Sequence, residues 1–122
     1  MNAQEAYTLA KSAKVTLKEQ SLRRVPFAVY TIIRYVDNEI QTNAYHGFYA
    51  TDVNLFSFKQ VDSYNFKEIF DQLVAHYKNL GFTLYTFKRS DRLLIYWRLD
   101  PPVKQSKFMR FLYMLFDARI KL

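Results

Sequence analysis

Residues 65–81 read NFKEIFDQLVAHYKNLG, and this stretch decides the class of fold. Its apolar side chains recur at intervals of three and four residues, which is the period of an amphipathic α-helix. They are Phe66, Ile69, Phe70, Leu73, Val74 and Tyr77. Asn65 followed by Glu68 has the spacing of a capping box, and Gly81 supplies a C-terminal stop. The stretch therefore predicts a helix over residues 66–79 with one buried face.

Two alternating segments follow this helix. Side chains alternate with a period of two over residues 82–88 and again over residues 93–99, on either side of the polar sequence RSDR at 89–92. This alternation indicates strands, and the short polar connection indicates a β-hairpin. We expect the apolar side of the hairpin to pack against the helix. The expected contacts join Phe70, Leu73, Ile95 and Trp97.

Two further helices are predicted upstream. Asn2 and Glu5 form a second capping-box pair, and an Ala-rich apolar stripe follows at helical intervals, so we expect a helix over residues 3–19. The stripe consists of Ala6, Leu9, Ala10, Ala13 and Leu17. A second helix is expected over residues 27–45, with Ser21 as a possible cap and Gly47 as its stop. A strand over residues 29–35 is the alternative, because β-branched and aromatic residues cluster there.

The order of elements predicts an α+β fold. Residues 48–58 read as extended, with a turn at Asp52 and Asn54 as a possible interruption, so the chain runs helix, helix, strand, helix, strand, strand. We expect two layers, with the N-terminal helices and the central helix packed on a small antiparallel sheet. Residues 1–100 would form this domain. Residues 101–122, which follow the break at Pro101-Pro102, would form a basic, aromatic C-terminal segment that is largely helical over 104–121.

Composition excludes several classes of protein. The chain of 122 residues has no cysteine, which excludes a disulfide framework and thiolate metal sites. His46 and His76 are too far apart in sequence to suggest a zinc site, and we expect no cofactor. The net charge of +7 favours contact with nucleic acid, acidic protein or anionic lipid. No apolar run of signal-peptide or membrane-spanning length is present, so we expect a protein that is not secreted.

No motif for catalysis is present. The two glycines are Gly47 and Gly81, so there is no Gly-rich phosphate loop, and neither a GxSxG nor an HExxH sequence occurs. Glu68 and Asp71 share a helix face and could do acid–base work or hold Mg²⁺, but a solvated helix face is the simpler interpretation. We therefore expect no catalytic and no metal-binding residues.

One segment resembles a known group of proteins. A helix ending in residues 32–40, the sequence Leu80-Gly81-Phe82 after the next helix, and a hairpin that closes on Ile95-Tyr96-Trp97 are similar to small α+β proteins encoded by tailed bacteriophages. Some of those are virion structural proteins. The resemblance covers residues 27–99 and implies a virion component. It transfers no functional residues, and the long aromatic tail and the shortage of glycine depart from the pattern.

The C-terminal segment is the predicted contact site. If it is helical, it presents a basic arc beside a wide apolar arc, which could dock on its own sheet, in a groove of a neighbouring subunit or on a membrane surface. The predicted partner-binding residues are Lys104, Lys107, Phe108, Arg110, Phe111, Leu112, Leu115 and Phe116. We expect a non-enzymatic structural or adaptor protein that contacts other protein subunits, in a virion or in host cytoplasm, with a homo-oligomer as one possibility. The alternative is a nucleic-acid-binding accessory protein, because basic and aromatic residues also interleave on the hairpin and the tail. A membrane is not favoured, since no second anchoring signal is present.

Overall fold

The computed structural model describes residues 1–87, 91–98 and 119–122. The described part is an α+β protein with helices on one side of an antiparallel sheet, as the order of elements predicted. In chain order its elements are α1 (Ala3–Arg23), α2 (Val25–Tyr45), β1 (Ala50–Asn54), the 3₁₀ turn η1 (Leu55–Ser57), α3 (Phe66–Asn79), β2 (Thr83–Phe87), β3 (Arg92–Tyr96) and β4 (Arg119–Lys121).

The helices begin and end close to where the sequence placed them. α3 has the predicted bounds, and α2 ends at Tyr45 as predicted but begins two residues early, with Pro26 in its first turn, where a missing N–H costs no hydrogen bond. Asn2 caps α1 as expected, because its Oδ1 accepts a hydrogen bond of 2.9 Å from the backbone N–H of Glu5. α1 runs four residues past its predicted end, to Arg23.

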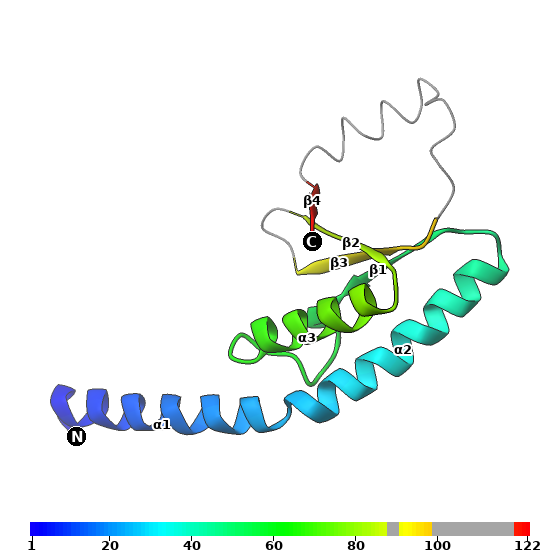
Figure 1. Cartoon of the computed structure of the whole chain (residues 1–122). Coiled ribbons are helices and arrows are strands. Elements are labelled where there is room, and N and C mark those ends of the chain that lie inside the picture. The colour runs from blue at the N-terminus through cyan, green and yellow to red at the C-terminus, as the bar shows by residue number, and fades with distance from the viewer. Residues whose placement is uncertain (88–90, 99–118) are drawn as a thin grey trace.

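The sheet has the strand order β1-β3-β2-β4, and every neighbouring pair is antiparallel. α2 and α3 lie together on one face, so the body has two layers (Figure 1). The hairpin β2–β3 is confirmed, with Leu84 opposite Ile95. The extended segment expected over residues 48–58 is shorter: β1 ends at Asn54, one of the two positions where an interruption was considered, and the chain then turns through η1.

The C-terminal residues end in a strand. β4 pairs with β2, with Ile120 opposite Thr86, and the backbone N–H of Leu122 donates to the carbonyl oxygen of Leu84 at 2.9 Å. The helix expected over residues 104–121 is therefore wrong for residues 119–121, and its remainder lies outside the described residues. Edge pairing satisfies backbone groups that a tail helix would have left open on β2.

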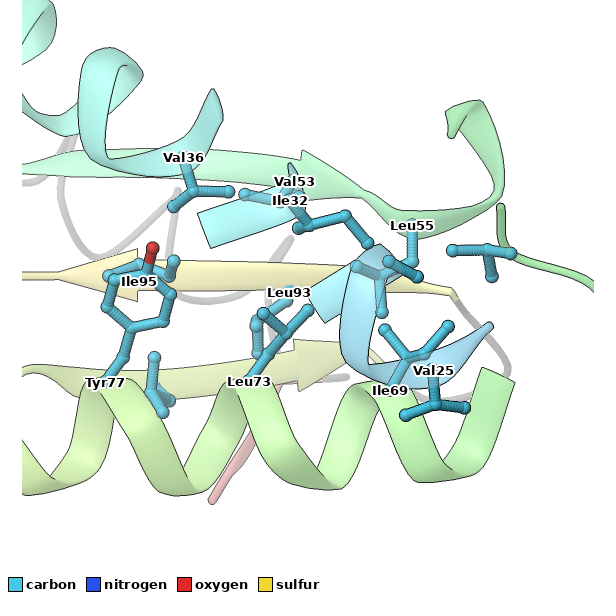
Figure 2. Close-up of a cluster of buried hydrophobic side chains, with 13 residues drawn as sticks. Val25, Ile32, Val36, Val53, Leu55, Ile69, Leu73, Tyr77, Leu93 and Ile95 are labelled. Carbon is cyan, nitrogen blue, oxygen red and sulfur yellow. The ribbon is translucent and has the colours of Figure 1, made fainter. Parts of the chain in front are cut away.

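The hydrophobic core lies between the sheet and the two packed helices (Figure 2). Its buried apolar residues are Val25, Ala28, Ile32, Val36, Val53, Leu55, Val61, Ile69, Leu73, Tyr77, Leu84, Leu93 and Ile95. Leu73 and Ile95 are both in this core, as predicted, and Phe70 packs against its edge. Trp97 was expected in the same cluster and is instead half-buried, with its ring edge-on to Phe82 at a centroid distance of 6.4 Å. The reason is that β3 ends at Tyr96, so Trp97 lies just beyond the pleat that directs alternate side chains inward.

Tyr77 joins α3 to α2 through the polar tip of a buried ring. Its hydroxyl donates to Oδ1 of Asp37 at 2.9 Å and lies 3.4 Å from the carbonyl oxygen of Ile33. Burial, together with the hydrogen bond and the negative charge of Asp37, raises the pKa of Tyr77 well above its ordinary value. The neutral phenol is therefore the form that the folded state stabilises.

Replacing Tyr77 with phenylalanine should lower the free energy of unfolding by about 1–3 kcal/mol at neutral pH, since Asp37 loses its donor. Because the folded-state pKa is raised, this stabilisation is complete below about pH 10 and declines as the pH rises above it, when the unfolded chain ionises Tyr77 first. Urea denaturation of both proteins from pH 7 upward measures the difference. The matched control is Tyr45→Phe at an exposed position, and an equal pH dependence of the two variants would contradict this role.

Candidate contact surfaces

The predicted contact residues of the tail lie outside the described part of the chain. This applies to Lys104, Lys107, Phe108, Arg110, Phe111, Leu112, Leu115 and Phe116. Their role as a partner-binding set stays a prediction. The described residues also include an extended exposed surface at the other end of the chain.

Helix α1 projects away from the two-layer body (Figure 1). Every residue from Met1 to Gln20 is exposed, and Ser21 is the one buried residue of the helix. α2 packs on the sheet as expected, whereas α1 contributes no side chain to the core. A helix in water gains most of its stability from packing an apolar face. The 21 residues of α1 therefore present a surface that packing within the described residues does not use.

The exposed surface of α1 includes its apolar stripe. Leu9 and Leu17 are 59% and 52% exposed, and the alanines that lie between them on the same face are exposed as well. Alanine and leucine at helical spacing let a second helix approach closely and bury methyl groups on both sides. The expectation that both N-terminal helices pack on the sheet is therefore wrong for α1, because the helical spacing predicts the stripe but not what lies against it.

A buried polar network holds the base of α1 against the turn before α3. Ser21 Oγ donates to the Asp62 carboxylate, 2.6 Å from Oδ1 and 2.8 Å from Oδ2. Asp62 Oδ1 also accepts from the backbone N–H groups of Tyr64 and Asn65, at 2.8 and 3.1 Å. Burial opposes the charge, but these hydrogen bonds and the nearby Arg24 outweigh it and lower the pKa of Asp62. Asp62 is therefore a charged anchor at neutral pH.

Asn65 completes this network from a fully buried position. Its Oδ1 accepts from the backbone N–H of Asp62 at 2.8 Å, and its Nδ2 donates to the carbonyl oxygens of Gln60 and Ser21 at 2.8 and 3.3 Å. The predicted capping box at Asn65 is wrong, because this side chain faces back toward the turn and makes no bond to the first turn of α3. The cap expected from Ser21 is wrong for the same reason, since Ser21 is used within the network and Arg24 precedes α2.

Helix α2 exposes aromatic side chains on the side away from the sheet. Phe27 and Tyr30 are both exposed, and the guanidinium of Arg34 lies 5.8 Å from the centre of the Tyr30 ring. Large exposed aromatics beside an arginine are typical of protein interfaces. This face adds to the surface that α1 offers.

The basic and aromatic residues of the hairpin are partly engaged with one another. Arg92 forms an ion pair of 2.6 Å with Asp52 on the neighbouring strand. Arg98 lies over the ring of Tyr49 at 5.2 Å. These contacts reduce what the hairpin can offer to a phosphate backbone. Lys88 and Arg89, two further basic residues of the hairpin sequence, lie outside the described residues.

The candidate catalytic and titratable residues take ordinary structural positions. Glu68 accepts a hydrogen bond of 3.0 Å from Gln72, and Asp71 faces solvent on the same helix. His46 Nδ1 lies 2.8 Å from the carbonyl oxygen of Thr42 at the C-terminal end of α2, and His76 lies edge-on to the ring of Tyr77. In the described ranges, no three His, Asp or Glu side chains come together as metal ligands would.

Comparison with protein-family models, with curated proteins and with solved structures gives no match. None of the helices within residues 1–87 or 91–98 combines the length and the apolar character needed to cross a bilayer.

Proposed function

We propose that this chain is a non-enzymatic structural or adaptor protein, which works by packing other protein subunits against its projecting helix α1. The observation that carries the proposal is the exposure of α1: of its 21 residues, Ser21 is the one that is buried. Such a helix is about 30 Å long, which is enough to contribute much of the roughly 800 Å² per partner that a specific interface buries.

The physical argument rests on helix stability. Isolated helices of this length are marginal in water, and most helical stability in proteins comes from packing an apolar face. The stripe that would pack is exposed along α1, from Ala6 to Leu17. Covering it with a neighbouring subunit would stabilise the helix and join the two subunits in one step.

A phage particle is the assembly that we propose, with the virion or the host cytoplasm as the location. The resemblance of residues 27–99 to small phage proteins supports this choice. The predicted C-terminal contact residues would form a second contact surface. Deleting residues 103–122 would also remove β4 from the sheet, so that deletion would not test the tail alone.

The test uses self-association, the simplest assembly that the stripe could support. Size-exclusion chromatography with light scattering should give a mass that is a multiple of 14.6 kDa for the full chain at raised concentration. Leu9→Glu combined with Leu17→Glu should return the 14.6 kDa monomer, because charges on the stripe cannot be buried unpaired. The matched control is Gln4→Glu with Ser12→Glu, which keeps the same spacing on the opposite face.

Hydrogen exchange adds a second measurement on the same samples. Amides of α1 should be protected in the oligomer and should exchange quickly in the monomeric variant, while amides of α3 stay protected in both. A chain that remains at 14.6 kDa at every concentration, with α1 amides exchanging as in an unfolded peptide, would remove α1 as the contact surface.

A further inference from the structure

A groove runs between the side of α1 and the turn that precedes α3. It has a volume of about 470 Å³, and its lining residues are Lys11, Lys14, Val15, Lys18, Ser63 and Tyr64. A second hollow of about 270 Å³ extends it toward the N-terminus, lined by Tyr7, Ala10, Lys11 and Lys14. Two of the lysines are therefore shared, and the hollows form one track along the helix.

The lysines of this track share one face of α1. Lys11, Lys14 and Lys18 follow the spacing i, i+3, i+7, which places three ammonium groups along roughly 10 Å of the helix axis. No carboxylate within the described residues lies in ion-pair distance of these lysines. The ion pair that the described residues do form joins Arg92 to Asp52 on the sheet. Asp62, the acid next to Ser63, is held by Ser21 and by backbone N–H groups. The positive charge of the groove is thus open to an external anion.

Aromatic rings accompany the charges. Tyr64 is half-buried in one wall of the groove, and the exposed Tyr7 stands one turn before Lys11. Rings beside a row of cations are what a single-stranded nucleic acid requires, because bases stack on the rings while phosphates contact the cations. A duplex fits less well, since the wall made by Ser63 and Tyr64 would obstruct a major groove closing around α1.

We propose that this groove binds single-stranded nucleic acid, with Lys11, Lys14 and Lys18 contacting phosphates and Tyr64 stacking on a base. The three lysines lie beside the apolar stripe of α1: the larger hollow contains no residue of the stripe, and the second hollow shares Ala10 with it. Nucleic acid and a protein subunit could therefore occupy the helix together. The failure of one proposal leaves the other in place.

Fluorescence anisotropy of the full chain with a labelled oligothymidylate tests the site. The logarithm of the binding constant should fall linearly with the logarithm of the salt concentration. Three phosphate contacts to a single strand should contribute about −2 to the slope of this line. The variant Lys11→Gln, Lys14→Gln, Lys18→Gln should lose that part of the slope, and its affinity at low salt should fall correspondingly. The matched control removes the same charge from exposed lysines elsewhere: Lys59→Gln, Lys67→Gln, Lys78→Gln.

Tyr64→Leu separates stacking from charge. It should weaken binding by roughly five- to 150-fold, the range measured for one base stacked on an aromatic ring, and should leave the salt slope unchanged. Circular dichroism checks that each variant keeps its helices. Equal losses in the two lysine variants would show general attraction to a basic protein and would overturn the site. Binding to phosphatidylserine vesicles with the same lysine dependence, but not to the oligonucleotide, would assign the groove to a lipid surface instead.

Discussion

Replacing Leu73 with alanine should lower the free energy of unfolding by about 2–5 kcal/mol, the cost of removing a large apolar side chain from a packed core. Leu73 is 1% exposed and lies on α3 where that helix faces the sheet (Figure 2). Its neighbours in the core come from α2, from α3 and from the central strands, so the cavity would be shared by both layers. Urea denaturation followed by circular dichroism measures the change.

Leu80→Ala is the matched control for this substitution. Leu80 is 62% exposed just after α3, so the same change in chemistry should alter the stability by about 0.5 kcal/mol or less. If Leu73→Ala had no larger effect than Leu80→Ala, α3 could not be the helix that closes the core.

Local pattern was sufficient for the main body of the fold. The bounds of α3, the hairpin and the Asn2 cap each depend on residues close together in sequence, and each is confirmed. The α+β class follows from these elements in order. Local pattern succeeds here because periodicity and caps are properties of single elements.

Three of the errors share a physical cause. Ser21 commonly caps helices, but here it is recruited by Asp62, 41 positions away. Asn65 is also a common cap, but its side chain bonds within its own turn, to Asp62 and Gln60, and to Ser21, 44 positions away. β4 is similar: residues 119–121 are too few to show alternation, and their pairing with β2 is decided by the open edge of the sheet. A contact with a distant segment contributes at each of these positions, and a local window does not contain that contact.

The candidate contact surfaces could also be predicted only in part from the sequence. The helical spacing of the sequence identified the apolar stripe of α1. The sequence could not show that α1 projects from the two-layer body, because the exposure of α1 depends on the direction in which α2 continues from it. It also could not place Tyr64 beside Lys11 and Lys18, since that proximity depends on the Ser21–Asp62 bonds.

Replacing Asn65 with alanine should have an effect comparable to that of Leu73→Ala, although it removes far less apolar surface. Two backbone groups lose their side-chain partner, the N–H of Asp62 and the carbonyl oxygen of Gln60, and the carbonyl oxygen of Ser21 keeps only the N–H of Arg24. Each buried group left unpaired costs about 1–3 kcal/mol, and water can reach some of them, so we expect a total loss of about 3 kcal/mol. Urea denaturation measures it, with Asn79→Ala at an exposed position as control.

The same variant also tests how the base of α1 is held. If Asn65 holds the turn before α3 against Ser21, its loss should increase hydrogen exchange at residues 20–25 more than in the middle of α3. The oligonucleotide affinity should fall as well, because Tyr64 would no longer be fixed beside the lysines of the groove. A loss of stability with unchanged exchange at residues 20–25 would mean that Asn65 supports only its own turn. The position of α1 would then depend on the Ser21–Asp62 hydrogen bonds alone.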